Sequence, residues 1–145
     1  MISIKEIDYQ EFELCFELDS STICLWNKKQ WENEFNKKAV KVYALFLENK
    51  IIGICTLEVI SDEGQINYFL IKEKFRKKGY GTYLMRYLIK QCENLNLQRI
   101  LLEVSQVNFS AEKFYSNFNF LTVGRRKKYY RDGSDAVLKE KYLIK

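Results

Sequence analysis

The sequence predicts an α/β protein of α+β character: a mixed, mostly antiparallel sheet of about seven strands with helices on both faces. Two observations lead to this class. Segments rich in β-branched and aromatic residues predominate from residue 40 to residue 71, and beyond that point such segments alternate with helical i, i+3, i+4 patterns. At 145 residues, with 47% hydrophobic and 30% charged residues, the chain is expected to fold as a single domain spanning residues 1–145.

Periodicity and turn residues divide the first half of the chain. Polar residues at 20–22 separate two amphipathic segments, and the short link at 48–50 suits a hairpin between two strands. A turn is expected at Asp62-Glu63-Gly64. The expected elements are a strand at residues 2–7, helices at 9–20 and 28–35, and strands at 40–47, 51–59 and 65–71.

The second half alternates between helix and strand. A helix is expected to begin near Gly79, because apolar residues recur on one face from residue 84 to Cys92. A strand at residues 99–104 and a helix at 111–118 follow. A sixth strand region is bracketed by residues 120–123 and 129–130, Asp132-Gly133 signals a hairpin, and residues 136–143 form the last strand.

The residue types that are missing limit the possible chemistry. The chain has no histidine, which excludes Ser/His and Cys/His mechanisms and argues against a zinc site, so proton transfer must use Glu, Asp, Tyr, Lys, Cys or water. Glu6 and Asp8 interrupt the apolar stretch that a signal peptide would need, so a cytoplasmic location is expected. In that reducing compartment the four cysteines are interpreted as buried free thiols: Cys15, Cys24, Cys55 and Cys92.

The net charge of +5 conceals two unlike halves. Residues 1–71 hold 7 Lys and Arg against 12 Asp and Glu, whereas residues 72–145 hold 17 against 7. A basic half can bind nucleic acid, can hold a polyanionic cofactor in a smaller area, or can serve only solubility. The acidic half would then attract a cationic substrate.

A basic loop with two glycines, RKKGYG at residues 76–81, stands between the fourth strand and an amphipathic helix. Free backbone N–H groups at a helix start carry partial positive charge, and Gly79 and Gly81 would let a diphosphate approach the backbone. A Rossmann fingerprint would need a third glycine where Leu84 stands, and a P-loop would need Gly-Lys-Ser/Thr at residues 81–83. The alternative without a ligand is a flexible turn before a helix.

This loop resembles the Arg/Gln-x-x-Gly-x-Gly/Ala signature of the GNAT family of acetyl-CoA-dependent N-acetyltransferases. The strand before it, the helix after it, the strand LLEV at residues 101–104, Asn108 and the helix that carries Tyr115 follow in the family's order. Asn119 stands where the family usually has glycine, and asparagine also tolerates a left-handed helix end. The resemblance covers nearly the whole chain and implies the GNAT fold, acetyl-CoA as co-substrate and no metal.

Within the family, the chain most resembles the bacterial ribosomal-protein-alanine N-acetyltransferases (RimI type). This similarity lies in the spacing of Glu103 to Asn108 and Tyr115, in the segment RRKKYY at residues 125–130, and in the closing hairpin around residues 132–136. It implies that an N-terminal amino group of a protein is the acceptor, with a ribosomal protein among the candidates. Neither a membrane nor a nucleic acid is expected as a partner, and the chain would act as a monomer or weak dimer.

The resemblance also implies roles for individual residues. Glu103 would be the general base, and Tyr115 would be the acid that protonates the coenzyme A sulfur. Tyr129 and Tyr130, expected to alternate faces on a strand, would grip the backbone of the acceptor. The residues expected to bind the cofactor are Phe69, Leu70, Ile71, Arg76, Lys77, Lys78, Gly79, Tyr80, Gly81, Thr82 and Asn108.

Each of these residues also has an interpretation that needs no ligand. Glu103 could be exposed simply by strand alternation, Tyr115 lies on the apolar stripe of its helix, and Asn108 could be a helix N-cap. Cys92, on an apolar helix face, is interpreted as core. Three other functions stay open: a GNAT enzyme for a lysine side chain, polyamine or aminoglycoside, a basic RNA- or ribosome-binding module, and a catalytically silent acyl-CoA sensor.

Overall fold

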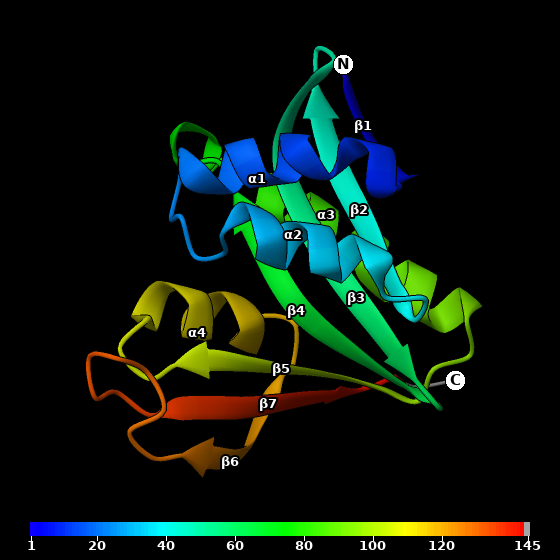
Figure 1. Cartoon of the computed structure of the whole chain (residues 1–145). Helices are drawn as coiled ribbons and strands as arrows, with labels where there is room; N and C mark the ends of the chain where they lie inside the picture. Colours follow the sequence, from blue (N-terminus) through cyan, green and yellow to red (C-terminus); the bar gives the residue numbers. More distant parts are fainter. Residues whose placement is uncertain (144–145) are drawn as a thin grey trace.

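The computed structural model describes residues 1–143, and these form one seven-stranded sheet with four α-helices (Figure 1). The sheet has the order β1-β2-β3-β4-β5-β7-β6, and every neighbouring pair is antiparallel except β4 and β5. The strands are β1 (Ile2–Ile7), β2 (Val40–Leu47), β3 (Lys50–Ile60), β4 (Glu63–Ile71), β5 (Arg99–Ser105), β6 (Leu121–Arg126) and β7 (Ala136–Tyr142). The α-helices are α1 (Phe12–Ser20), α2 (Lys28–Asn36), α3 (Tyr80–Asn94) and α4 (Phe109–Ser116), with 3-10 turns at Tyr9–Glu11 and Glu73–Phe75. The expected fold class, a mostly antiparallel sheet covered on both faces, is confirmed.

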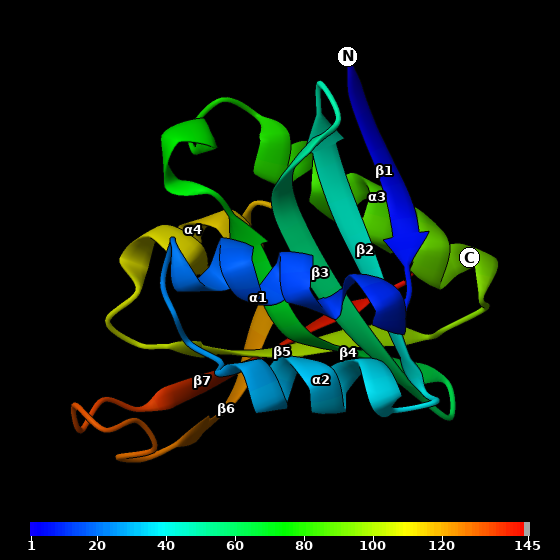
Figure 2. The ribbon, with the colours of Figure 1, turned by 45° about the horizontal axis from the view of Figure 1, so that its top comes forward.

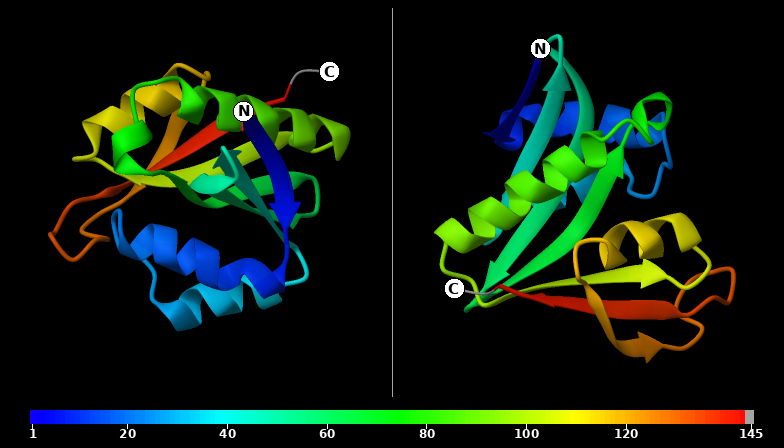
Figure 3. Two further views of the ribbon diagram at one scale, coloured as in Figure 1. Left: turned by 90° about the horizontal axis from the view of Figure 1, so that it is seen from above. Right: turned by 180° about the vertical axis from the view of Figure 1, so that it is seen from behind.

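The helices form two layers on opposite sides of the sheet. Helices α1 and α2 cover one face, and α3 and α4 cover the other (Figures 2 and 3). Alternation along β2 divides the core between them, since Val42 and Ala44 pack under α1 and α2 while Tyr43 and Leu45 belong to the cluster under α3 and α4. No helix within residues 1–143 is long and apolar enough to cross a membrane.

Three expectations from the sequence are wrong in detail. Strand β4 already begins at Glu63, so the turn before it lies at Ser61 and Asp62, where Ser61 takes the positive φ of 57°. Strand β6 ends at Arg126, which leaves Tyr129 and Tyr130 in the β6–β7 loop instead of on a strand. Cys24 is exposed, because it lies in the α1–α2 loop and not on a helix face, whereas the other three cysteines are buried. All four thiols are free, as expected.

Strands β4 and β5 pair at one end only and then separate. The parallel register runs from Glu63 opposite Arg99 to Gln65 opposite Leu101 and stops there. Arg99 stabilises the end at which β4 and β5 are paired. Its guanidinium forms ion pairs with Glu63 of β4 and with Glu140 of β7, the latter at 2.8 Å. Beyond this end the two strands diverge (Figure 3), so the β5 side of residues 66–71 is free of a neighbouring strand.

A β-bulge bends β4 just before its open segment. The register against β3 shifts between Thr56 and Leu57, which leaves Asn67 as the extra residue on β4. The Asn67 amide donates to Glu34 of α2 at 2.9 Å and to Glu58 of β3 at 3.0 Å. Helix α2 thereby fixes the bulge and, with it, the direction in which residues 68–71 leave the sheet.

We expect the folded protein to lose stability above about pH 9. Burial raises the pKa of the Cys55 thiol above its usual range and that of Cys92 to about 12. Between the unfolded and folded pKa values, the unfolded chain has lost protons that the folded chain keeps. The free energy of unfolding therefore falls by about 1.4 kcal/mol per pH unit for each such group. Urea unfolding should show a lower midpoint at pH 10 than at pH 8.

The matched control for this pH effect is Cys92→Ala, which removes one of the three buried thiols whose pKa burial raises and leaves Cys15 and Cys55. Its unfolding midpoint should fall less steeply between pH 8 and pH 10 than that of the unchanged protein. Equal slopes for the two proteins would contradict the role of Cys92.

Candidate active site

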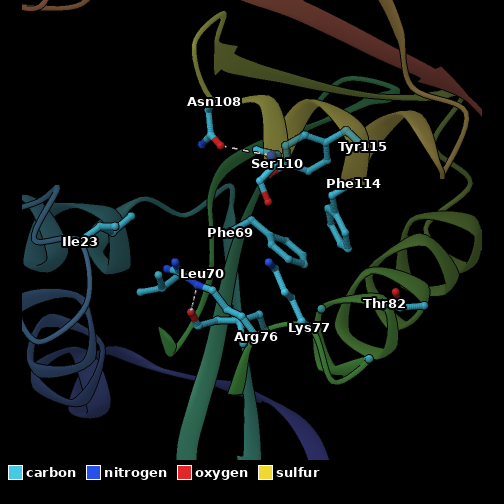
Figure 4. Close-up of a pocket in the computed structure, with 14 residues that line it drawn as sticks. Ile23, Phe69, Leu70, Arg76, Lys77, Thr82, Asn108, Ser110, Phe114 and Tyr115 are labelled. Carbon is cyan, nitrogen blue, oxygen red and sulfur yellow. Dashed lines mark hydrogen bonds between the residues drawn. The ribbon is translucent and has the colours of Figure 1, made fainter. Parts of the chain in front are cut away.

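An open pocket of about 420 Å³ lies where β4 has left β5 (Figure 4). One wall is the end of β4, the floor is the loop before α3, and the opposite wall is α4. The residues that line it are Ile23, Phe69, Leu70, Ile71, Arg76, Lys77, Gly79, Gly81, Thr82, Asn108, Ser110, Ala111, Phe114 and Tyr115. The pocket thus occupies the space that the one-ended β4–β5 pairing creates.

The loop at the start of α3 presents unpaired backbone N–H groups. Gly79 is the N-cap of this 15-residue helix, has φ of 88° and makes no side-chain cap, so the first N–H groups of the helix have no cap acceptor. Lys77 also takes a left-handed φ of 61°, and the Arg76 Nε–H donates to the Ile71 carbonyl at 3.0 Å, which folds the loop back onto β4. These N–H groups and the neighbouring cations are the chemistry that an anion-binding site requires.

The middle of the pocket is apolar and narrow. The rings of Phe69 and Phe114 lie 5.5 Å apart and both point into it, with the Lys77 side chain reaching toward Phe69 from the loop (Figure 4). A Cβ atom on Gly81 would lie 3.3 Å from the Phe114 ring. Glycine at this position therefore keeps the start of α3 close to α4.

Asn108 is the helix N-cap that the sequence offered as one interpretation, and it also lies at the pocket. Its side-chain oxygen accepts a hydrogen bond from the Ala111 N–H at 3.1 Å, which caps the N-terminus of α4. At the other end of α4, Asn119 takes the left-handed φ of 67° that was expected of it.

Tyr115 lies at the far end of the pocket from the glycine loop (Figure 4). Its side chain is 9% exposed and packs among Phe69, Phe114 and Phe120. Burial raises the pKa of Tyr115, so its hydroxyl stays protonated at neutral pH. Within residues 1–143 this hydroxyl makes no hydrogen bond, which leaves its proton available to a ligand.

The Glu103 side chain lies on the face of the sheet that is opposite to Tyr115. Ile100, Leu102 and Val104 point into the core beneath α4, and alternation therefore turns Glu103 toward the other side of the sheet. Its carboxylate accepts a hydrogen bond from the Arg126 Nε–H at 3.2 Å. Glu103 does not line the pocket. The opening between β4 and β5 is the route from its side of the sheet to the pocket.

The β6–β7 loop carries the two tyrosines that the sequence suggested for acceptor binding. Tyr130 is half-buried, and burial together with the Glu103 charge raises its pKa. Tyr129 is 56% exposed, and the Arg126 guanidinium lies 5.8 Å from the centre of its ring. Tyr130 is accordingly the half-buried tyrosine whose pKa is affected by the Glu103 charge, and Tyr129 lies at the surface.

The structure brings together most of the residues that the sequence suggested for the cofactor. Lys78 and Tyr80 are exceptions, since neither lines the pocket. Sequence reasoning missed Ile23 and Ser110 and treated Ala111 and Phe114 only as core. Ile23 gives no local signal, because the pocket acquires it only when the α1–α2 loop folds against β4.

A sheet that opens beside a phosphate-type loop, with an apolar channel leading to a protonated tyrosine, defines a class of transferases that use a coenzyme A thioester. The chain belongs to the acetyltransferase (GNAT) family, whose model matches residues 4–120.

Known proteins resemble this chain over its whole length. A [ribosomal protein bS18]-alanine N-acetyltransferase of Haemophilus ducreyi is 29% identical over 145 residues, covering 97% of this chain and 99% of that protein. The crystal structure of the ribosomal-protein-S18-alanine N-acetyltransferase from Escherichia coli has a TM-score of 0.90 at 20% identity, over 97% of this chain and 92% of that one. PaiA N-acetyltransferase from Thermoplasma acidophilum, solved in complex with coenzyme A, has a TM-score of 0.80 at 18% identity, over 99% of each chain. The two structures show the shared fold.

Proposed function

We propose that this protein transfers an acetyl group from acetyl-CoA to the N-terminal α-amino group of a protein. The observation that carries the proposal is the pocket, which joins an anion-binding loop to a protonated Tyr115 through an apolar channel. The acceptor is suggested by the relative in Haemophilus ducreyi, whose name specifies the alanine of a ribosomal protein. The four free thiols fit the reducing cytoplasm, where we place the reaction.

The residues present fit acetyl-CoA. The uncapped N–H groups after Gly79, together with Arg76 and Lys77, suit a pyrophosphate. The free edge of β4 at residues 69–71 suits the peptide-like pantetheine arm, which can extend a sheet by backbone hydrogen bonds. When bound, the thioester supplies an activated acetyl carbonyl with a thiolate leaving group.

Tyr115 is the proposed proton donor. Transfer forms the amide C–N bond and breaks the C–S bond, and the departing thiolate takes up a proton. Tyr115 is the protonated side chain at the end of the channel opposite the glycine loop. The same hydroxyl can be reprotonated from solvent after the product leaves.

Glu103 is the proposed base, acting through water. An N-terminal ammonium has a pKa of about 8, so only one proton must be removed near neutral pH. Glu103 faces away from Tyr115, and a water in the opening between β4 and β5 would connect the carboxylate to the amine. On this side, the α1–α2 loop and Tyr130 of the β6–β7 loop would hold the acceptor backbone.

The proposal is tested with a peptide that begins with a free alanine amine. With acetyl-CoA present, the protein should acetylate this peptide. It should not acetylate the same sequence with a blocked N-terminus and an internal lysine. Mass spectrometry of the products locates the acetyl group. Transfer to the lysine alone, or to a polyamine alone, would replace the proposed acceptor by a side-chain or small amine. No transfer despite acetyl-CoA binding would indicate a sensor.

A further inference from the structure

A buried carboxylate, Asp19 at the end of α1, has no part in the mechanism above. Its side chain is fully buried, and among the described residues it forms no ion pair. Burying a carboxylate without a counter-charge costs several kcal/mol unless its oxygens are well supplied with hydrogen bonds. The arrangement around Asp19 therefore calls for an explanation beyond packing.

Asp19 accepts hydrogen bonds from three separate parts of the fold. One oxygen accepts from the Leu25 N–H at 3.0 Å and from the Tyr68 hydroxyl of β4. The other accepts from the Trp26 N–H and from the Trp31 indole of α2, both at 2.9 Å. All four donors are neutral, and between them they satisfy both oxygens.

The α1–α2 loop is wrapped around this residue. The Asp19 carbonyl also accepts from the Thr22 and Cys24 N–H groups, at 3.0 and 2.6 Å. Cys24 takes a left-handed φ of 52°, a conformation that a non-glycine residue adopts only when its surroundings hold it there. Between these two residues stands Ile23, which is 52% exposed and lines the pocket.

Asp19 thus connects two elements that border the pocket, the α1–α2 loop and β4. Through Leu25 and Trp26 it holds the loop that carries Ile23, and through Tyr68 it holds the strand residue just before Phe69. We propose that Asp19 is a positioning residue for acyl transfer, which keeps Ile23 in place as the wall of the acceptor side. The inference relies on the proposed function only for the choice of acceptor.

The test compares Asp19→Asn with the unchanged protein. An amide keeps one acceptor oxygen and turns an N–H group toward donors, so two of the four bonds are lost. We expect the KM for the alanine-led peptide to rise at least tenfold. The KM for acetyl-CoA should change less than twofold, because none of the four donors to the Asp19 carboxylate belongs to the glycine loop or to residues 69–71.

Three further variants separate positioning from stability. Val42→Ala opens a cavity in the same core cluster without touching Asp19, so it should lower the Tm and leave both KM values unchanged. Ile23→Ala should raise the peptide KM with little change in Tm. Tyr68→Phe removes a single bond and should raise the peptide KM about threefold, which keeps the test usable if Asp19→Asn does not fold.

Amide hydrogen exchange provides a readout that needs no acceptor. In Asp19→Asn, Leu25 and Trp26 should lose protection, because their N–H groups donate to the Asp19 carboxylate, while residues 84–92 of α3 keep theirs. Unchanged protection, or a peptide KM that rises no more than in Val42→Ala, would overturn the proposal. Failure of the unchanged protein to acetylate the peptide would overturn only the proposed function, and the exchange result would still decide whether Asp19 holds the loop.

Discussion

Replacing Tyr115 with phenylalanine is expected to lower kcat about a hundredfold, which is the lower end of what a positioned general acid contributes. The hydroxyl makes no hydrogen bond within residues 1–143, and the ring is held by three neighbouring aromatic side chains. Phenylalanine keeps the ring, so the Tm and the affinity for coenzyme A should both be preserved. Steady-state kinetics with saturating acetyl-CoA and the alanine-led peptide measure the effect.

The matched control is Tyr87→Phe. Tyr87 lies on α3, where its ring contacts Tyr43, and it does not line the pocket. Removing its hydroxyl should therefore leave kcat unchanged. A kcat for Tyr115→Phe within twofold of the unchanged protein would show that the thiolate leaves without this proton, and the acid assignment would then be abandoned.

Replacing Glu103 with glutamine is expected to lower kcat/KM for the peptide about a hundredfold at pH 7. The loss should shrink as the pH rises toward 9, because an amine with a pKa of about 8 then loses its proton without help. Stability should hardly change, since the Glu103–Arg126 pair is partly exposed and such pairs contribute about 1 kcal/mol or less. A pH–rate profile from 6 to 9.5 measures the effect.

Arg126→Gln serves as the control for this second prediction. It breaks the same ion pair, whose N–O distance is 3.2 Å, but it keeps the carboxylate. If Arg126→Gln lowers kcat/KM as much as Glu103→Gln does, the ion pair and not the base is what matters. If Glu103→Gln lowers kcat/KM by the same factor at every pH, the carboxylate positions the acceptor and does not take its proton.

The sequence by itself determined the secondary-structure elements and the position of the loop proposed to bind the cofactor. Periodicity identified every strand and α-helix of the described chain to within a few residues, because all of them except β6, which has no buried residue, have an apolar side that faces a core. The glycine loop could be found for the same local reason. Its function depends on the backbone of a few consecutive residues, Gly79 to Thr82, and not on distant contacts.

The proposed acceptor side was decided only by the tertiary structure. Local preference extended the sixth strand to Tyr129 and Tyr130, but these residues lie in a loop that hydrogen bonds to Ser134 hold in place, so pairing across the hairpin outweighed β-propensity. Asp19 looks like any polar residue at a helix end, and its burial follows from donors as far away as Tyr68.

Glu103 shows the same division between sequence and structure. Its spacing to Tyr115 is fixed along the chain, but the two side chains lie on opposite faces of the sheet. They can serve one reaction only because β4 and β5 separate after three paired positions. The Asn67 bulge bends β4 before its unpaired segment, and the Arg99 ion pairs hold the end where the two strands stay paired. Both are contacts between residues far apart in the sequence, which no local pattern records.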